Sequence, residues 1–124
     1  MIIAIDFDGT CVTHEYPQMG YEIGAPEVIR KLAVKGHQLI LFTMRTDKEL
    51  HAATEWFKFN SIPLWGINEN PEQFKWSQSR KVYASLYIDD AALGCPLTVN
   101  PSHSDRPFVD WDEIEIMLEK KGLI

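Results

Sequence analysis

The chain has 124 residues, of which 45% are hydrophobic, and its 18 acidic and 12 basic side chains give a net charge of −6. This length predicts one domain, residues 1–124, and the acidic balance disfavours nucleic acid as a partner. No apolar run is long enough to cross a membrane, so we expect no membrane partner. Cys11 and Cys95 indicate no disulfide framework, and Asp6 interrupts the opening apolar run too early for a signal peptide, so we expect a cytoplasmic protein.

The first predicted element is a buried strand that runs directly into two carboxylates. Residues 2–5 are apolar and mostly β-branched, a run too short for a helix. Asp6 and Asp8 follow at a spacing of two, so both can address one small volume near the end of the strand. Gly9 allows a sharp turn there and brings main-chain N–H groups close to a bound group.

Two further elements follow at short spacing. Residues 11–23 show no helical period and predict a flap-like loop or small hairpin. A helix is predicted between Pro26, at its first turn, and Gly36, just past its end. Residues 38–43 then predict a second buried strand, which ends in the hydroxyl of Thr43.

The second half of the chain continues to alternate. Thr46 and Glu49 form a capping-box pattern that opens a second long helix. Asp110 and Glu113 form the same pattern ahead of a last helix. Between these two helices the sequence predicts strands at 64–67, 86–88 and 97–99, a loop at 68–75 and a short helix at 79–84.

Strands that alternate with helices predict an α/β fold with a parallel sheet, right-handed crossovers and helices on both faces. The carboxyl ends of parallel strands meet at one edge, which is where such sheets bind ligands. Three predicted strands end in polar residues at that edge: Asp6 and Asp8, Thr43, and Asp89 with Asp90.

Four carboxylates at one edge repel one another unless a cation or protons compensate. A set of ligands made only of oxygen atoms favours Mg²⁺, which also accepts water and substrate phosphate. Lys81 can supply a positive charge for a phosphate, although a solvated lysine on a short helix is an equally good interpretation.

The order Asp-x-Asp-Gly-Thr at residues 6–10, then Thr43, Lys81 and Asp89–Asp90, resembles the haloacid-dehalogenase-like (HAD) phosphohydrolase superfamily. The resemblance extends over essentially the whole chain and is closest to small, capless, phage-type members. It implies a three-layer, Rossmann-like fold with the sheet order 5-4-1-2-3. Residues 11–23 and 68–80 are too short to fold as an inserted cap domain.

The resemblance also implies a reaction and a set of roles. The protein would be a hydrolase, a Mg²⁺-dependent phosphatase in which Asp6 attacks phosphorus and forms an aspartyl-phosphate. Asp8 would act as acid and then as base. The other implied contacts are with phosphate, through Asp6, Gly9, Thr43 and Lys81, and with metal, through Asp6, the main-chain carbonyl of Asp8, Asp89 and, through water, Asp90.

Several interpretations stay open at this stage. Arg80 could replace Lys81 as the phosphate cation. Arg45 could meet a second anionic group of the substrate, but a solvated arginine at a helix entrance is the favoured interpretation. The four histidines lack metal-ligand spacing and receive no role, and packing is favoured over substrate stacking for Tyr16, Tyr21, Trp65 and Trp76.

The substrate is also open. An uncapped site is consistent with a small phosphorylated substrate, with an exposed phosphate on a phosphoprotein or nucleic-acid end, or with closure by a second subunit in a homo-oligomer. A non-catalytic, receiver-like phosphate-binding module is the alternative class. There the acidic pair precedes the phosphoacceptor, whereas here Asp6 and Asp8 come first and Asp89–Asp90 last.

Overall fold

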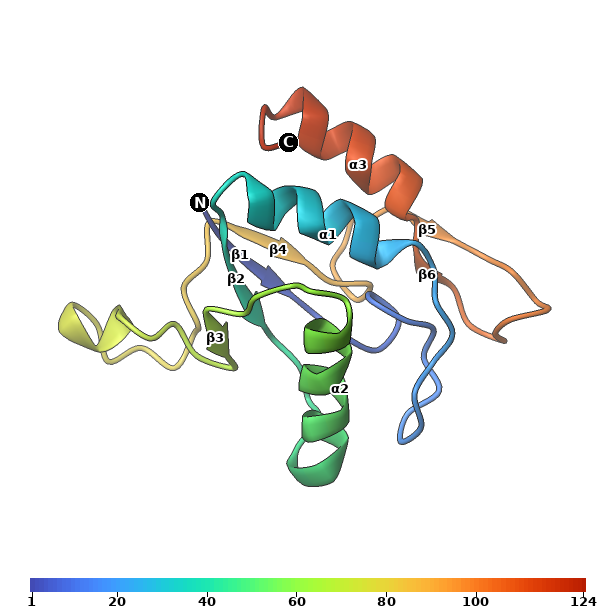
Figure 1. Cartoon of the computed structure of the whole chain (residues 1–124), viewed down its shortest axis with the longest axis horizontal. Coiled ribbons are helices and arrows are strands. Elements are labelled where there is room, and N and C mark those ends of the chain that lie inside the picture. The colour runs from blue at the N-terminus through green and yellow to red at the C-terminus, as the bar shows by residue number, and fades with distance from the viewer.

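The computed structural model describes residues 1–124 and contains a parallel sheet with three α-helices (Figure 1). The sheet has the order β3-β2-β1-β4, which confirms the expected adjacency of the first, second and fourth strands. None of the helices has both the length and the apolarity that a membrane span requires. The sheet strands are β1 (Ile2–Ile5), β2 (Gln38–Leu41), β3 (Gly66–Ile67) and β4 (Leu86–Ile88), and the helices are α1 (Ala25–Val34), α2 (Asp47–Phe59), α3 (Trp111–Lys120) and the short 3₁₀ helix η1 (Gln73–Lys75).

One face of the sheet carries most of the core. Side chains alternate along each strand, so Ile3 and Ile5 point to one face while Ala4 points to the other. The first face packs in one cluster with buried residues of all three helices. The second face forms a smaller cluster in which Ala4 packs with Val82 and Ala84, and no helix contributes to it. The expected helical cover on both faces, and with it the three-layer arrangement, is therefore not confirmed.

The segment between β3 and β4 explains this difference, because side-chain amides take over the hydrogen bonds that a helix would have made. The Nε2 atom of buried Gln73 donates to the carbonyl oxygens of Ser79 and Lys81, and its Oε1 atom accepts from the Tyr83 N–H. Residues 79–84 are thus irregular, and the short helix predicted there is wrong; the only helical turn in this segment is η1.

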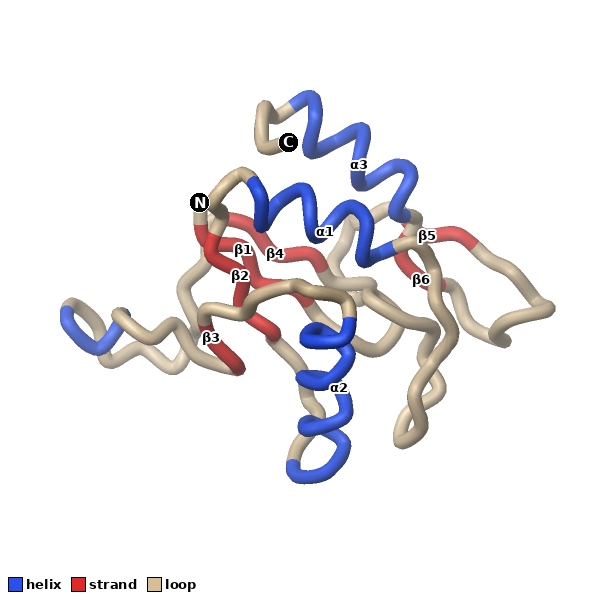
Figure 2. Tube along the Cα trace, in the orientation of Figure 1, coloured by secondary structure: helices blue, strands red, loops and turns tan.

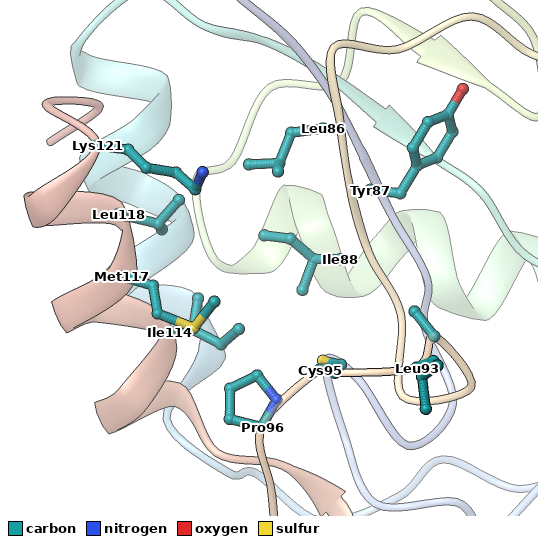
Figure 3. Close-up of a pocket in the computed structure, with 12 residues that line it drawn as sticks. Leu86, Tyr87, Ile88, Leu93, Cys95, Pro96, Ile114, Met117, Leu118 and Lys121 are labelled. Carbon is teal, nitrogen blue, oxygen red and sulfur yellow. The ribbon is translucent and has the colours of Figure 1, made fainter.

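The fifth predicted strand also differs from expectation. β5 (Leu97–Thr98) pairs in antiparallel fashion with β6 (Phe108–Val109) in a separate two-stranded sheet and not with β4. β4 is therefore an edge strand. An apolar cavity of about 190 Å³ lies beside it, between Leu86 and Ile88 on the strand and Ile114 and Leu118 on α3 (Figure 3).

Two of the long connections lie at the same end of the molecule, away from the segment between β3 and β4 (Figure 1). The loop after β1 and the loop that joins β5 to β6 both extend from the same side of the fold (Figures 1 and 2). The first of them is a small hairpin, as predicted, because Thr13 N–H donates to the Tyr21 carbonyl and Tyr21 N–H donates to Thr13 Oγ1. We call residues 13–21 the flap and residues 99–107 the β5–β6 loop.

Helix ends follow the sequence in part. Asp110 caps α3 by accepting from the N–H groups of Asp112 and Glu113, as predicted. Thr46 is the N-cap residue of α2, but its side chain makes no capping hydrogen bond, so the capping box predicted with Glu49 does not form.

Candidate functional site

The turn after β1 is fixed by hydrogen bonds that close it on itself. The Phe7 carbonyl accepts from the N–H groups of Thr10 (3.1 Å) and Cys11 (2.8 Å). Gly9 has φ +81°, a conformation that side chains disfavour, and a Cβ atom there would overlap the Asp90 carboxylate. The indole N–H of Trp111, at the start of α3, donates to the Thr10 carbonyl at 2.6 Å. The turn is thus held against both β4 and α3.

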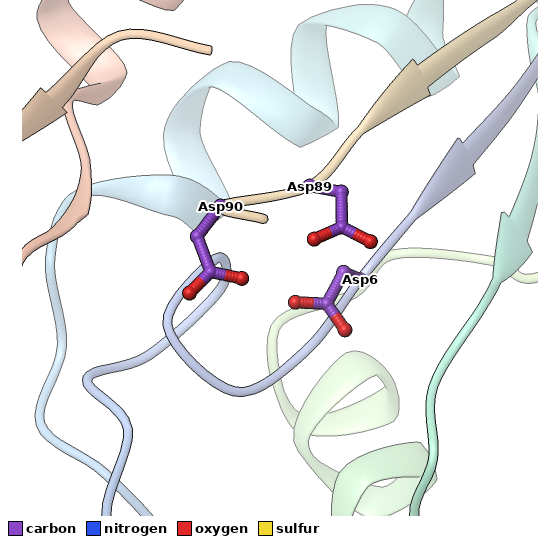
Figure 4. A group of neighbouring side chains, drawn as sticks. All are labelled: Asp6, Asp89 and Asp90. Atoms are coloured by element: carbon purple, nitrogen blue, oxygen red, sulfur yellow. The ribbon is translucent and has the colours of Figure 1, made fainter. Parts of the chain in front are cut away.

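Three of the predicted carboxylates meet at this turn. One oxygen each of Asp6, Asp89 and Asp90 lies within 4.8 Å of the others, at the ends of the adjacent strands β1 and β4 (Figure 4). Thr10 links two of them: its hydroxyl donates to Asp6 Oδ2 at 2.8 Å and accepts from the Asp90 N–H at 3.0 Å. We call these three aspartates the acidic cluster.

The acidic cluster is electrostatically strained when no cation is present. The pKa of Asp6 is raised to about 8, chiefly by burial and in addition by the charges of Asp89 and Asp90, while the hydrogen bond from Thr10 opposes the shift. Burial likewise raises the pKa of Asp89. Three hard oxygen donors with no nitrogen or sulfur ligand among them fit Mg²⁺, which would relieve this repulsion.

Asp8 does not join the acidic cluster; its side chain is paired with Arg45. Arg45 Nε donates to Asp8 Oδ2 at 2.8 Å and Nη2 donates to Oδ1 at 2.7 Å, so both carboxylate oxygens are occupied. The Arg45 side chain is only 1% exposed, which makes its interpretation as a solvated arginine wrong. Of the predicted metal ligands, the Asp8 carboxylate therefore lies outside the group that could share one ion.

Arg45 also connects Asp8 to the flap and to α2. Its Nη2 atom donates to the Gln18 carbonyl at 2.8 Å and its Nη1 atom to the Glu49 carbonyl at 3.3 Å. The guanidinium lies 5.3 Å from the centre of the Tyr16 ring, within the range of a cation–π contact. One buried cation therefore holds the second aspartate of the motif, the flap and a helix together.

Thr43 lies in the same cavity as the aspartates. This cavity, which we call the acidic cavity, has a volume of about 510 Å³. Thr43 is held by its main-chain N–H, which donates to Asn68 Oδ1 at 2.7 Å, and its Oγ1 atom accepts from the Arg45 N–H. The residues that line the cavity are Asp6, Asp8, His14, Tyr16, Thr43, Met44, Arg45, Asp89, Asp90, Ala91 and Arg106.

The two predicted phosphate cations are not among these lining residues. Lys81 is exposed, and its Nζ atom lies 5.8 Å from the centre of the Tyr87 ring. Arg80 is exposed and lines a different cavity, beside Gln73. The structure therefore brings together Asp6, Asp8, Thr43, Asp89 and Asp90 but leaves both Lys81 and Arg80 outside the cavity.

Other residues at the site were not predicted. Thr10 was recognised as the last residue of the motif but was given no role, and the structure places its hydroxyl between Asp6 and Asp90. Asn68, His14 and Arg106 come from loops, where no periodicity indicates which way a side chain points. Tyr16 was predicted to pack, and it does contact Arg45, but it also lines the cavity.

Comparisons with known proteins give one informative similarity. No protein-family model and no curated protein matches the chain. A solved structure, described as that of a conserved protein coded by locus from Bacteroides thetaiotaomicron, is similar with 36% sequence identity and a TM-score of 0.78. The similarity covers 98% of this chain and 91% of that one, and the description states no activity.

Proposed function

The chain belongs to the same family as the conserved Bacteroides thetaiotaomicron protein, and we propose that it is a Mg²⁺-dependent phosphomonoester hydrolase of the haloacid-dehalogenase-like type. The observation that carries this proposal is the position of Asp6, which lies with Asp89 and Asp90 at the carboxyl ends of two adjacent parallel strands. This is the edge at which open parallel sheets place ligands. Thr43, from the end of the neighbouring strand, lines the same cavity.

In the first half of the reaction, Asp6 is the nucleophile. Thr10 holds Oδ2, so we assign the attack on phosphorus to Oδ1. The bond from phosphorus to the ester oxygen breaks, the leaving group departs with that oxygen, and the phosphoryl group becomes bound to Asp6. A Mg²⁺ ion held by Asp6, Asp89 and Asp90 would stabilise the negative charge that develops on the phosphoryl oxygens.

Asp8 is assigned the proton transfers. It protonates the leaving oxygen in the first step and accepts a proton from water when that water attacks the aspartyl-phosphate. Each Asp8 oxygen accepts one hydrogen bond from Arg45 and keeps a second lone pair that can carry a proton. The two-point contact with Arg45 fixes the orientation of the Asp8 carboxylate in the cavity.

Neutral donors around Asp6 are suited to hold the phosphoryl oxygens. The N–H groups of Phe7 and Asp8 have no main-chain acceptor, so they are free to donate to a bound phosphate. The Thr43 hydroxyl accepts from Arg45 N–H and keeps its own proton for donation. Lys81 remains a proposed phosphate cation, which would have to turn from the Tyr87 ring into the cavity.

The test is hydrolysis of phenyl phosphate and 4-nitrophenyl phosphate by the purified protein, with Mg²⁺ and with EDTA. We expect turnover that requires Mg²⁺ and that falls by several orders of magnitude in Asp6→Asn, because one group is lost as both nucleophile and ligand. Asp112→Asn, which removes an exposed carboxylate on α3, is the matched control and should retain wild-type activity. Equal activity of wild type and Asp6→Asn would exclude the proposed nucleophile.

A further inference from the structure

The acidic cavity contains two arginines, and only one of them is free. Arg45 is committed to Asp8, Gln18 and Glu49. Arg106 is exposed, and its guanidinium makes no hydrogen bond or ion pair; the residue's one such contact is from its main-chain N–H to Ser104 Oγ. Since Lys81 lies outside the lining, Arg106 is the free permanent cation of this cavity.

Arg106 is presented from a loop that is anchored beside the catalytic turn. It lies two residues before β6, whose residues Phe108 and Val109 are buried. The Val109 N–H donates to the Gly9 carbonyl at 3.0 Å, so the base of the β5–β6 loop is attached directly to the turn that carries Asp6 and Asp8. The exposed Arg106 side chain therefore stands just ahead of a buried strand that is hydrogen-bonded to the turn after β1.

The flap faces the cavity with His14 and Tyr16 and is connected to the β5–β6 loop. The rings of Tyr21, on the flap, and His103, on the β5–β6 loop, lie 5.7 Å apart. Both loops extend from the same side of the fold (Figure 1). The flap and the β5–β6 loop therefore both border the acidic cavity. These two loops can contact the part of a substrate beyond its phosphoryl group, so the chain needs no inserted cap domain for that contact.

Size and charge then restrict what that part can be. A volume of about 510 Å³ is within the range of pockets that hold whole small molecules, so a phosphoryl group at Asp6 leaves most of it unfilled. Any second anion must avoid the acidic cluster, because like charges in a partly buried site repel strongly. Arg106 offers such an anion a fork of donors that matches a carboxylate or phosphate in two-point contact.

We propose that Arg106 recognises a second anionic group on the leaving portion of the substrate. This inference rests on the proposed phosphatase function and specifies its substrate class: small phosphate monoesters whose leaving group carries a carboxylate or a second phosphate. Arg106 determines specificity in this scheme, and Asp6 and Asp8 carry out the chemistry.

The test uses matched pairs of substrates that differ only in charge. Initial rates are measured with 3- and 4-carboxyphenyl phosphate and with the corresponding carbamoyl compounds, in which an amide replaces the carboxylate. We expect kcat/KM to favour a carboxylate substrate by about tenfold, as is typical of one charge-assisted contact. Arg106→Gln should abolish this preference, Arg106→Lys should retain part of it, and Lys120→Gln, an exposed charge on α3, should leave it unchanged.

A binding measurement separates this inference from the proposed function. 4-Carboxybenzylphosphonate cannot be hydrolysed, and its affinity is compared with that of its carboxamide by calorimetry, in wild type and in Arg106→Gln. Tighter binding of the carboxylate that depends on Arg106 supports the inference even if no ester is hydrolysed. The absence of hydrolysis would then reject only the proposed phosphatase function. Equal affinities and equal kcat/KM values within both pairs, or a preference that survives in Arg106→Gln, would overturn the role of Arg106.

Discussion

Replacement of Arg45 by methionine tests the buried ion pair that sequence analysis did not predict. The Arg45 side chain is 1% exposed and the Asp8 side chain 11% exposed, and two hydrogen bonds of 2.7 and 2.8 Å join them. Methionine fills much of the same volume but leaves the Asp8 charge without a partner. It also removes the donors to the Gln18 and Glu49 carbonyls.

The expected cost is large for a single substitution. Removing one partner of a buried ion pair typically costs about 3–5 kcal/mol, because the other charge stays buried and uncompensated. For a domain of this length, roughly 4 °C of melting temperature corresponds to each kcal/mol, so the shift should be about 12–20 °C. Addition of Asp8→Asn removes the orphaned charge, so the double variant should be more stable than Arg45→Met alone.

The assay is urea and thermal unfolding of wild type, both single variants and the double variant. Lys31→Met is the matched control, because Lys31 and Glu115 form an ion pair of 2.6 Å that lies at the surface. Its loss should affect the free energy of unfolding far less, since exposed pairs are screened by solvent. A cost of Arg45→Met below about 1 kcal/mol, or a double variant less stable than Arg45→Met, would refute the reasoning.

Three further predictions concern the acidic cluster. The pKa of Asp6 is raised from 3.8 to about 8, so the folded, metal-free protein binds this proton more tightly than the unfolded chain. The free energy of unfolding should therefore fall as the pH rises from about 4 to about 8. In Asp6→Asn, unfolding measured at several pH values should show a smaller fall over the same range. Mg²⁺ at a hundredfold excess over its Kd should raise the free energy of unfolding by about 2.7 kcal/mol. Asp89→Asn should reduce this gain while raising metal-free stability. A wild-type melting temperature that does not change when Mg²⁺ is added at constant ionic strength would contradict the metal site. Gly9→Ala should weaken Mg²⁺ binding, measured by calorimetry, because its Cβ would displace the Asp90 carboxylate, whereas Gly94→Ala, at a similar φ but with open space around the Cβ, should leave Mg²⁺ affinity unchanged.

Much of the sheet and of the acidic cluster could be predicted, because both depend on local patterns. The apolar runs at residues 2–5 and 86–88 are short and bounded by polar residues, and the structure confirms both as strands. Parallel strands place their carboxyl ends together, which is why the approach of Asp6 to Asp89 and Asp90 followed from the sequence.

The remainder depended on contacts between distant residues. Arg45 is buried because Asp8, 37 positions earlier, accepts from it, and no local pattern reports such a partner. Leu97 and Thr98 form a strand as predicted, but so short a strand does not specify its neighbour. It pairs with Phe108 and Val109 and not with β4. Lys81 was expected on a helix, and the amide of Gln73 instead binds its carbonyl oxygen in an irregular segment.

The most direct test of the central claim is to identify the residue that receives the phosphoryl group. The protein with Mg²⁺ is mixed with 2,4-dinitrophenyl phosphate, whose leaving group needs no proton, and is quenched in acid during turnover, and its peptides are analysed by mass spectrometry. The account predicts a phosphoryl group on the peptide that contains Asp6, present in wild type and absent in Asp6→Asn. Steady hydrolysis with no phosphorylated peptide at any quench time, or a phosphoryl group on another residue, would contradict it.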